Sequence, residues 1–287
     1  MLSIIVSSYQ ENHFTNFSES VKNTIGNTPY EIIKVWNPKL MGLCEAYNKG
    51  VEQAKYDYLL FVHEDVLFIT KNWGNVLLNH LKDSKTGAIG IAGSTYKSNY
   101  PTSWSSVKYC KRQYISKSAI EENNDIIIDN PNNEYKSRVC SLDGVFIATK
   151  KDIWLEYKFD QNLLKDFHGY DIDFSLSVSQ KYNVFVIYDI LIFHVSSGNQ
   201  NKEWLKAVMQ ISDKWKNKLP VSINILTIKE KNEYSTICFA TFAYYLKKHN
   251  YKKHKIIFCL IKYSSLRNFL HPYWMLKKIY LFFKLFI

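Results

Sequence analysis

The first hundred residues alternate short apolar runs with longer segments in which apolar residues recur every three or four positions. The apolar runs predict buried strands, and the periodic segments predict amphipathic helices. Strands are predicted at 2–6, 31–36, 58–62 and 88–92, and helices at 14–25, 42–54 and 72–81. This order is typical of an α/β protein with a mainly parallel sheet and helices on both of its faces.

The periodicity weakens after residue 92. Residues 93–118 show no clear period, which predicts a long functional loop. Further strands are predicted at 126–128 and 138–141, joined across a turn at 129–133, and at 145–148, 184–188 and 191–194. Further helices are predicted near 152–157, in a segment that ends near 181, and at 202–216. We expect one large α/β domain, 1–220, followed by a helical C-terminal region, 221–287.

The strand at 58–62 ends where the chemistry of the predicted site begins. Its five apolar or aromatic residues stop abruptly at His63-Glu64-Asp65. Ligands of open α/β sheets bind at the carboxyl ends of the strands, and Mg²⁺ and Mn²⁺ prefer carboxylate oxygen. Asp65, with His63 one pleat away on the same face, therefore suggests a metal site that holds a diphosphate. A loop of solvated charges after a core strand explains the isolated triplet equally well.

The net charge of +11 belongs to the C-terminal end of the chain. No acidic residue follows Glu233, whereas ten lysines and arginines do; the rest of the chain holds 27 basic and 26 acidic residues. Only three of the 37 basic residues are arginine, which argues against bidentate readout of bases or phosphates. We therefore expect no nucleic-acid partner.

Several classes of protein lose support from the sequence. The five cysteines form no CxxC pair, so neither a disulfide framework nor a zinc site is expected, and a cytoplasmic location fits best. Residues 1–6 lack a basic start and predict a first strand rather than a signal peptide. No GxGxxG or GxxxxGK[ST] stands at a strand-to-helix turn, which weakens the case for a dinucleotide or P-loop site.

Six short motifs follow one another in a specific order. They are Ser7-Ser8-Tyr9, Asn37, Asn48-Lys49-Gly50, His63-Glu64-Asp65, Asp143-Gly144 and Tyr170-Asp171-Ile172-Asp173-Phe174. In this order and spacing they resemble the motifs of GT-A fold glycosyltransferases of the family 2 type, over roughly residues 1–200. The resemblance implies a Rossmann-like GT-A fold, a nucleotide-sugar donor and Mn²⁺ or Mg²⁺ as the cofactor.

The resemblance also assigns roles to residues. It implies Asp65 and His194 as metal ligands and Asp171 as the catalytic base. The implied donor-binding set comprises Ser7, Ser8, Tyr9, Glu11, Asn37, Tyr47, Asn48, His63, Glu64, Asp143 and Gly144. This chain departs from the family pattern in three places, since His63 replaces the first DxD carboxylate, Tyr170 replaces the acid of the ED motif, and Asn37 replaces a commoner Asp.

Other readings of the same residues stay open. His194 also fits a structural histidine after an apolar run. Asp173 is expected to cap its helix or orient a neighbour, because it lies on a different helical face from Asp171. His168 and Tyr170 are candidates for the acceptor pocket, although a Tyr packed on the sheet is the simpler expectation for the latter. Asp143 contacts donor or acceptor, or forms a turn with the glycine that follows.

The last sixteen residues, 272–287, predict an amphipathic helix that is too short and too charged to span a bilayer of about 30 Å. A helical wheel places Lys277, Lys278 and Lys284 on one side. It places Met275, Leu276, Ile279, Phe282, Phe283 and Phe286 on the other. We expect this tail to bind an anionic membrane surface, with docking on the protein's own core as the alternative.

The sequence as a whole predicts an inverting, metal-dependent glycosyltransferase. We expect it to work on the cytoplasmic face of a membrane, with UDP as the nucleotide and a glycan or lipid-linked saccharide as the acceptor in cell-surface polysaccharide synthesis. A catalytically inactive module that binds glycans or membranes is the first alternative. A nucleotidyltransferase is the second, although residues 7–12 lack the glycine-rich basic loop that such an enzyme needs.

Overall fold

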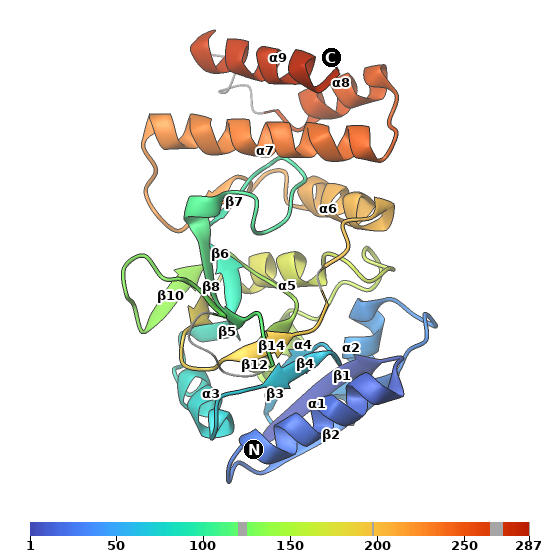
Figure 1. Ribbon diagram of the computed structural model, residues 1–287, viewed down its shortest axis with the longest axis vertical. Helices are drawn as coiled ribbons and strands as arrows, with labels where there is room; N and C mark the ends of the chain where they lie inside the picture. The colour runs from blue at the N-terminus through green and yellow to red at the C-terminus, as the bar shows by residue number, and fades with distance from the viewer. Residues whose placement is uncertain (120–124, 197, 265–271, 287) are drawn as a thin grey trace.

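The computed structural model describes residues 1–119, 125–196, 198–264 and 272–286. Its largest element is a seven-stranded sheet with the strand order β10-β13-β5-β12-β3-β1-β2 (Figure 1). In chain order the strands are β1 (Leu2–Ser8), β2 (Tyr30–Trp36), β3 (Tyr58–Val62), β5 (Thr86–Gly90), β10 (Lys136–Val139), β12 (Phe146–Lys150) and β13 (Asn183–Ile187). β10 and β12 run against the other five, so the sheet is mainly parallel, as predicted.

Helices cover both faces of this sheet. One core cluster contains buried residues of α1 (Glu11–Thr24) and α3 (Trp73–Leu81), and the other contains buried residues of α2 (Leu43–Gln53), α4 (Lys151–Glu156) and α5 (Tyr170–Val178). β3 shows why the strands are apolar throughout. Leu60 and Val62 belong to the first cluster, and Leu59 and Phe61 belong to the second. Successive side chains point to opposite faces, and here both faces are buried.

A second sheet of six short strands adjoins the first, with the order β11-β6-β8-β14-β4 and β9 paired to β8. Its strands are β4 (Val66–Phe68), β6 (Ala92–Ser94), β8 (Lys111–Ser116), β9 (Ile126–Asp129), β11 (Ser141–Leu142) and β14 (Ile192–His194). A third pair joins β7 (Tyr96–Lys97) to β15 (Val221–Ser222). β9 and β10, which the sequence joins across a turn, belong to different sheets.

The prediction of an irregular loop over 93–118 is wrong for most of that segment. It contains part of β6, all of β7 and β8, and a 3₁₀ turn at Lys108–Cys110. These strands have two to six residues. β6 and β8 pair with each other, and all three strands also pair with parts of the chain outside the segment, so no local period reveals them. Residues 98–107 do lack regular structure, and this shorter loop borders the site described below.

The helices described after β14 are α6 (Lys202–Lys214), α7 (Ile228–Lys248), α8 (Lys253–Lys262) and α9 (Pro272–Phe286). A capping box formed by Thr227 and Glu230 starts α7. The buried residues of α7 belong to the same core cluster as those of α5 and α6. α8 and α9 lie on the outer side of α7 (Figure 1). Within the described ranges, no helix combines the length and apolar character needed to cross a bilayer.

The predicted C-terminal helix is present as α9, but the prediction for its faces is wrong in part. Lys278 is only 8% exposed, because it faces α7 and its Nζ donates a hydrogen bond to Ser235 Oγ at 2.9 Å. Met275 and Phe282, assigned to the membrane-facing side, are half-buried, and Phe282 packs against the core. A helical wheel gives the angles between side chains but not the direction of the neighbour on which the helix packs.

Candidate active site

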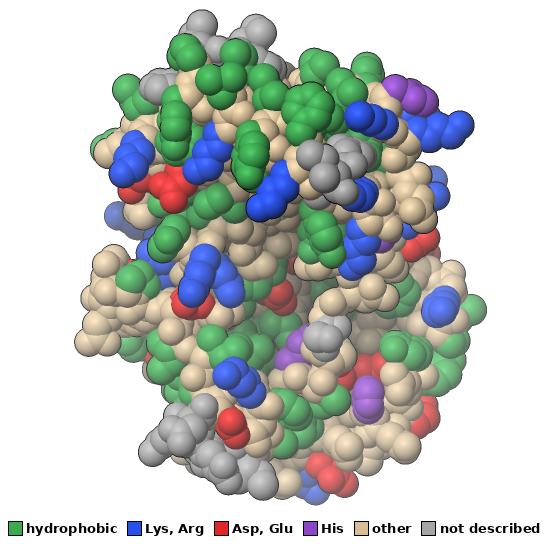
Figure 2. Space-filling view, turned by 45° about the horizontal axis from the view of Figure 1, so that its top comes forward, with side chains coloured by type: hydrophobic (Ala, Val, Ile, Leu, Met, Phe, Trp, Pro, Cys, Tyr) green, Lys and Arg blue, Asp and Glu red, His purple; other side chains and the backbone are tan. Residues whose placement is uncertain are grey.

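The site lies where the carboxyl ends of β3 and β14 meet. β14 pairs antiparallel with β4, and this register sets His194 opposite Val66 and next to Asp65. The backbone N–H of Val195 donates to Asp65 O at 3.0 Å, and that of Ser196 donates to Asp65 Oδ2 at 3.2 Å. Figure 2 shows a hollow between the C-terminal helices and the rest of the molecule in which acidic and histidine side chains gather.

Three side chains at this junction form a candidate metal centre. One ligand atom from each of His63, Asp65 and His194 lies within 4.8 Å of the others. His194 Nε2 is 3.2 Å from Asp65 Oδ1 and 3.5 Å from His63 Nδ1. Two imidazoles and a carboxylate are a suitable donor set for a divalent transition metal. The structure thus brings together the two predicted ligands and adds His63 as a third.

The protonation of this cluster follows from its geometry. Burial favours the neutral form of His194, but the hydrogen bond and negative charge of Asp65 outweigh burial and raise the pKa of His194. Burial likewise opposes the charge of Asp65, yet the bond from His194 holds the pKa of Asp65 below its usual range. Without a metal, a proton on His194 therefore joins the two side chains, and a bound cation would take its place.

His63 is held by a hydrogen-bond chain that fixes its tautomer. Tyr170 donates its only hydroxyl proton to Gly144 O at 2.8 Å, so its oxygen must accept from His63 Nε2, also at 2.8 Å. Burial, reinforced by the charge of His194, lowers the pKa of His63, which keeps the ring neutral. Its proton thus sits on Nε2, and the Nδ1 lone pair faces the metal centre. A Cβ on Gly144 would lie 2.1 Å from the Tyr170 hydroxyl, so only glycine allows this contact.

Replacing Tyr170 with Phe should weaken Mn²⁺ binding by about 10- to 100-fold, the usual cost of losing a partner that orients a metal-bound histidine. Titration of the purified protein with Mn²⁺ by calorimetry measures this directly. Tyr188→Phe is the matched control, because its hydroxyl bonds Ser137 away from the site. Equal Mn²⁺ affinity in the Tyr170 variant and the wild type would refute the orienting role.

Asp171 lies in the first turn of α5, next to Tyr170 and half-buried. Burial and, second, the negative charge of Asp143 raise the pKa of Asp171 to about 7, although backbone N–H groups of Ile172 and Gly144 oppose the shift. A carboxylate with a pKa near neutrality is suited to accept a proton from a substrate. The charge of Asp143 also acts on His63 and His194, so Asp171 and the candidate metal centre share one polar site.

Asp173 has a different task from Asp171, as their positions on the helix predict. Its Oδ2 accepts from Lys214 Nζ and its Oδ1 from Trp215 Nε1, each at 2.8 Å. Both partners come from the end of α6. Asp173 therefore ties α6 to the base of α5 and orients its neighbours.

Some of the predicted donor-binding residues on and after β1 make contacts inside the protein, and others lie at its surface. Glu64 is buried and accepts hydrogen bonds from Ser8 Oγ at 2.6 Å and from the backbone N–H groups of Tyr9 and Gln10. It therefore shapes the turn into α1. Tyr9 follows the end of β1 and is half-exposed. Glu11 forms a surface ion pair with Lys34 at 2.6 Å.

Three other predicted donor contacts point inward. Asn37 is fully buried, and its amide bonds Ser7 Oγ, Met41 O and the N–H groups of residues 40 and 41. Asn48 donates to Phe159 O at 2.9 Å and to the side chain of Gln161. Tyr47 is fully buried against Phe61, Phe159 and Tyr170. These side chains hold two loops in place rather than presenting atoms to a ligand.

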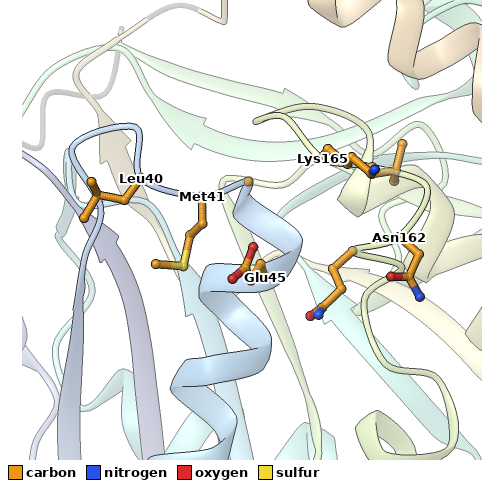
Figure 3. A pocket seen from close by; sticks show the side chains of 8 residues that line it. Leu40, Met41, Glu45, Asn162 and Lys165 are labelled. Carbon is orange, nitrogen blue, oxygen red and sulfur yellow. The ribbon is translucent and has the colours of Figure 1, made fainter.

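The loop that leads into α2 and the loop that precedes α5 line a pocket of about 390 Å³ beside the start of α2 (Figure 3). Its lining residues are Leu40, Met41, Gly42, Glu45, Gln161, Asn162, Leu164 and Lys165. Figure 3 shows that side chains from α2 and from the loop before α5 lie on opposite sides of it. Charged and amide groups dominate this lining, which suits a ligand rich in hydroxyl groups.

Sequence reasoning missed two contributors to the site. Trp104, from the loop at 98–107, donates its indole N–H to Asp143 Oδ2 at 2.5 Å and stays half-exposed. The lack of period in this segment identified the loop but not the residue. Ser196 supplies the backbone N–H that holds Asp65, and no side-chain pattern could have indicated that role.

Comparison with known proteins places this geometry in a class. The family described as "Glycosyltransferase like family" matches residues 3–235, and the chain belongs to this family. Among curated proteins no sequence matches the chain. The family and the arrangement of the sheet together identify a glycosyltransferase with the GT-A fold.

Two solved structures share the fold at low sequence identity. One is "Crystal structure of GalNAc-T7 with UDP, GalNAc and Mn2+", with a TM-score of 0.55 and 11% identity over 89% of this chain and 55% of that one. The other is "Crystal structure of S. aureus TarS", with a TM-score of 0.52 and 12% identity over 99% of this chain and 54% of that one. The chain therefore spans about half the length of each. The confirmed predictions are the GT-A fold and the glycosyltransferase class.

Proposed function

We propose that this glycosyltransferase moves a sugar from a nucleoside-diphosphate donor to a hydroxyl group of a saccharide acceptor. The observation that carries the proposal is the cluster of His63, Asp65 and His194 beside the carboxylate of Asp171. The cluster suits a cation that holds a diphosphate, and the carboxylate suits a base for an acceptor hydroxyl. A module that only binds glycans would need neither.

The donor set of the cluster favours Mn²⁺ over Mg²⁺. Mg²⁺ requires oxygen ligands in a nearly ideal octahedron, whereas Mn²⁺ accepts imidazole nitrogen as well. His63, Asp65 and His194 would hold the ion with two nitrogens and one oxygen. When bound, the ion would neutralise charge that develops on the departing diphosphate. The GalNAc-T7 structure, which contains UDP, GalNAc and Mn²⁺, is consistent with this preference.

The chain's own residues perform the remaining steps. Asp171 removes the proton from the acceptor hydroxyl, and with a single base opposite the leaving group we infer an inverting displacement. Asp143, held by Trp104, adds to the effect of burial in raising the pKa of Asp171, and we expect it to contact a hydroxyl of the donor or the acceptor. The ring of Trp104 offers an apolar surface for a sugar. We expect the half-exposed ring of Tyr9 to stack on the nucleotide base, and we expect that base to be uracil.

The pH dependence of kcat/KM should show an acid limb near pH 7, because only ionised Asp171 accepts a proton and its pKa is about 7. Activity should fall as the pH drops below this value. Asp143→Asn removes the neighbouring charge that helps raise the pKa of Asp171, so the limb should move to lower pH in this variant. Steady-state rates between pH 5 and 9 measure both profiles. A limb that stays in place in the Asp143 variant would contradict the assignment.

The test of the proposed function is turnover of a panel of nucleotide sugars, with and without Mn²⁺, read as release of nucleoside diphosphate. Candidate glycan and lipid-linked acceptors are added to each reaction, since hydrolysis in their absence is slow. We expect one donor to turn over with Mn²⁺ and not with EDTA. Turnover that is equal in EDTA would exclude the metal role, and failure of every donor and acceptor would favour a binding module. Acceptors drawn from cell-surface polysaccharides test the expected biological setting.

A further inference from the structure

The outer face of the two C-terminal helices is apolar where a water-exposed helix would be polar. On α9, Tyr273, Leu276, Tyr280 and Phe283 are each more than half exposed. Their spacing of three, four and three residues places them on one stripe of the helix. Figure 2 shows apolar side chains gathered over the C-terminal helices, with lysines among them.

α8 also exposes apolar side chains. Ile257, Phe258 and Ile261 are exposed by 41%, 68% and 62%, while Ile256 and Leu260 point into the core. Both helices pack on the outer side of α7, so their exposed sides face away from the sheets (Figure 1). We call the exposed apolar residues of α8 and α9 the C-terminal apolar surface.

The inner face of α9 carries a charge in place of an apolar residue. Lys278 is 8% exposed, and its Nζ lies over the rings of Tyr100 at 5.4 Å and Phe239 at 5.8 Å while it donates to Ser235. Burial lowers the pKa of Lys278 to about 8. A helix that buries a lysine and exposes four large apolar or aromatic side chains has the reverse of the polarity expected for contact with water.

Exposed cations surround the apolar surface. Lys277 and Lys284 flank the stripe on α9, and Lys252 and Lys255 stand at the start of α8. The sequence holds no acidic residue after Glu233. A second copy of the chain docked through the same surface would bring these like charges together, which disfavours a symmetric dimer. An anionic lipid surface would bury the apolar side chains and pair with the lysines. Tyrosine is well suited to the headgroup region.

We propose that the C-terminal apolar surface, formed jointly by α8 and α9, binds the surface of an anionic bilayer. Phe258, Leu276 and Phe283 enter the boundary between headgroups and acyl chains, and the lysines around them contact lipid phosphates. The protein lies on the membrane without crossing it. This proposal is about where the enzyme is located, for which we expect the cytoplasmic leaflet. It does not depend on the transfer chemistry.

Flotation of the full chain with vesicles tests the proposal. The probes are vesicles of phosphatidylcholine alone and of phosphatidylcholine mixed with phosphatidylglycerol. We expect the wild type to float with the anionic vesicles and to bind neutral ones far more weakly. The triple variant Phe258→Ser, Leu276→Ser, Phe283→Ser should reduce partitioning by about 100-fold or more, since three large apolar side chains no longer insert. Lys277→Gln with Lys284→Gln should reduce it by roughly 25-fold on anionic vesicles.

A matched triple variant controls for the loss of exposed apolar residues. Ile128, Leu155 and Ile225 are exposed by 58%, 58% and 101% outside this surface, and their change to Ser should leave flotation unaltered. Thermal melting of both triple variants confirms that each one folds. Unchanged flotation of the first variant, or absence of wild-type binding to anionic vesicles, would overturn the proposal. So would a dimer in light scattering that the first variant abolishes, because the surface would then bind protein.

The same proteins separate this proposal from the proposed function. Donor turnover in solution, measured without vesicles, should be equal in the wild type and in both triple variants. Vesicle binding without turnover of any donor would leave the membrane surface in place and refute the transfer chemistry. Turnover without vesicle binding would support the transfer chemistry and refute the membrane surface.

Discussion

Asp65→Asn should lower Mn²⁺-dependent kcat/KM by about 1000-fold, because a bound cation supplies several kcal/mol of transition-state stabilisation and each 1.4 kcal/mol changes the rate tenfold. Asp65 is the one carboxylate in the cluster, and His194 and the backbone of Ser196 both hold it in place. An amide keeps the shape of the side chain but removes the charge that attracts the ion. Mn²⁺ affinity, measured by calorimetry, should fall with the rate.

The control for this variant is Asp83→Asn. Asp83 is an exposed carboxylate in the turn that precedes β5, paired with Lys136 at 3.5 Å. It lies at the amino end of the strands and therefore at the edge opposite the site. Its replacement should change neither the rate nor Mn²⁺ affinity. Wild-type activity in the Asp65 variant, with Mn²⁺ present, would show that the metal binds elsewhere or takes no part.

Asp171→Asn should lower kcat by about 100- to 10,000-fold, the range that a positioned general base contributes. Unlike the Asp65 variant, it should bind Mn²⁺ and donor nearly as well as the wild type, since Asp171 is not one of the three cluster residues. Single-turnover rates and donor titrations, compared in the same protein, separate the two effects. Asp213→Asn, which removes a surface carboxylate paired with Lys262, is the control.

The two variants together distinguish a metal ligand from a base. Loss of rate with retained Mn²⁺ affinity is expected only for Asp171, and loss of both only for Asp65. A fall in Mn²⁺ affinity in the Asp171 variant equal to that in the Asp65 variant would move Asp171 into the metal centre. A kcat within a factor of ten of the wild type would exclude Asp171 as the base.

The first half of the fold was predictable because its strands are buried on both faces and its helices on one. β3 has the predicted bounds, and α2 and α3 start within one residue of the predicted ones. The second sheet was predictable only in part, since β9 and β14 match the strands predicted at 126–128 and 191–194. β11 in this sheet and β7 in the third pair have two residues each and are strands only because distant segments pair with them. Local periodicity carries no information about such pairings.

In the site, too, contacts between residues that are far apart in the sequence could not be predicted from local patterns. The resemblance to the family suggested Asp65 and His194 as one pair of ligands. In the structure they lie close together because β14 pairs with β4, the strand that follows Asp65. The bond between His63 and Tyr170 joins residues 107 positions apart, and no local pattern contains it. The resemblance assigned Asn37, Tyr47 and Asn48 to donor binding, but a sequence pattern does not give the direction of a side chain. Each of them turns inward, where backbone groups or aromatic rings are the nearest partners.

The central claim is that His63, Asp65 and His194 form a divalent-metal site that holds the donor's diphosphate. Calorimetric titration of the purified protein with UDP, in Mn²⁺ and in EDTA, tests this claim most directly, because it requires neither the correct sugar nor the acceptor. We predict that UDP binds in Mn²⁺, and that this binding disappears in EDTA and in the Asp65→Asn variant. UDP binding of equal strength in EDTA, or in the Asp65 variant, would contradict the claim.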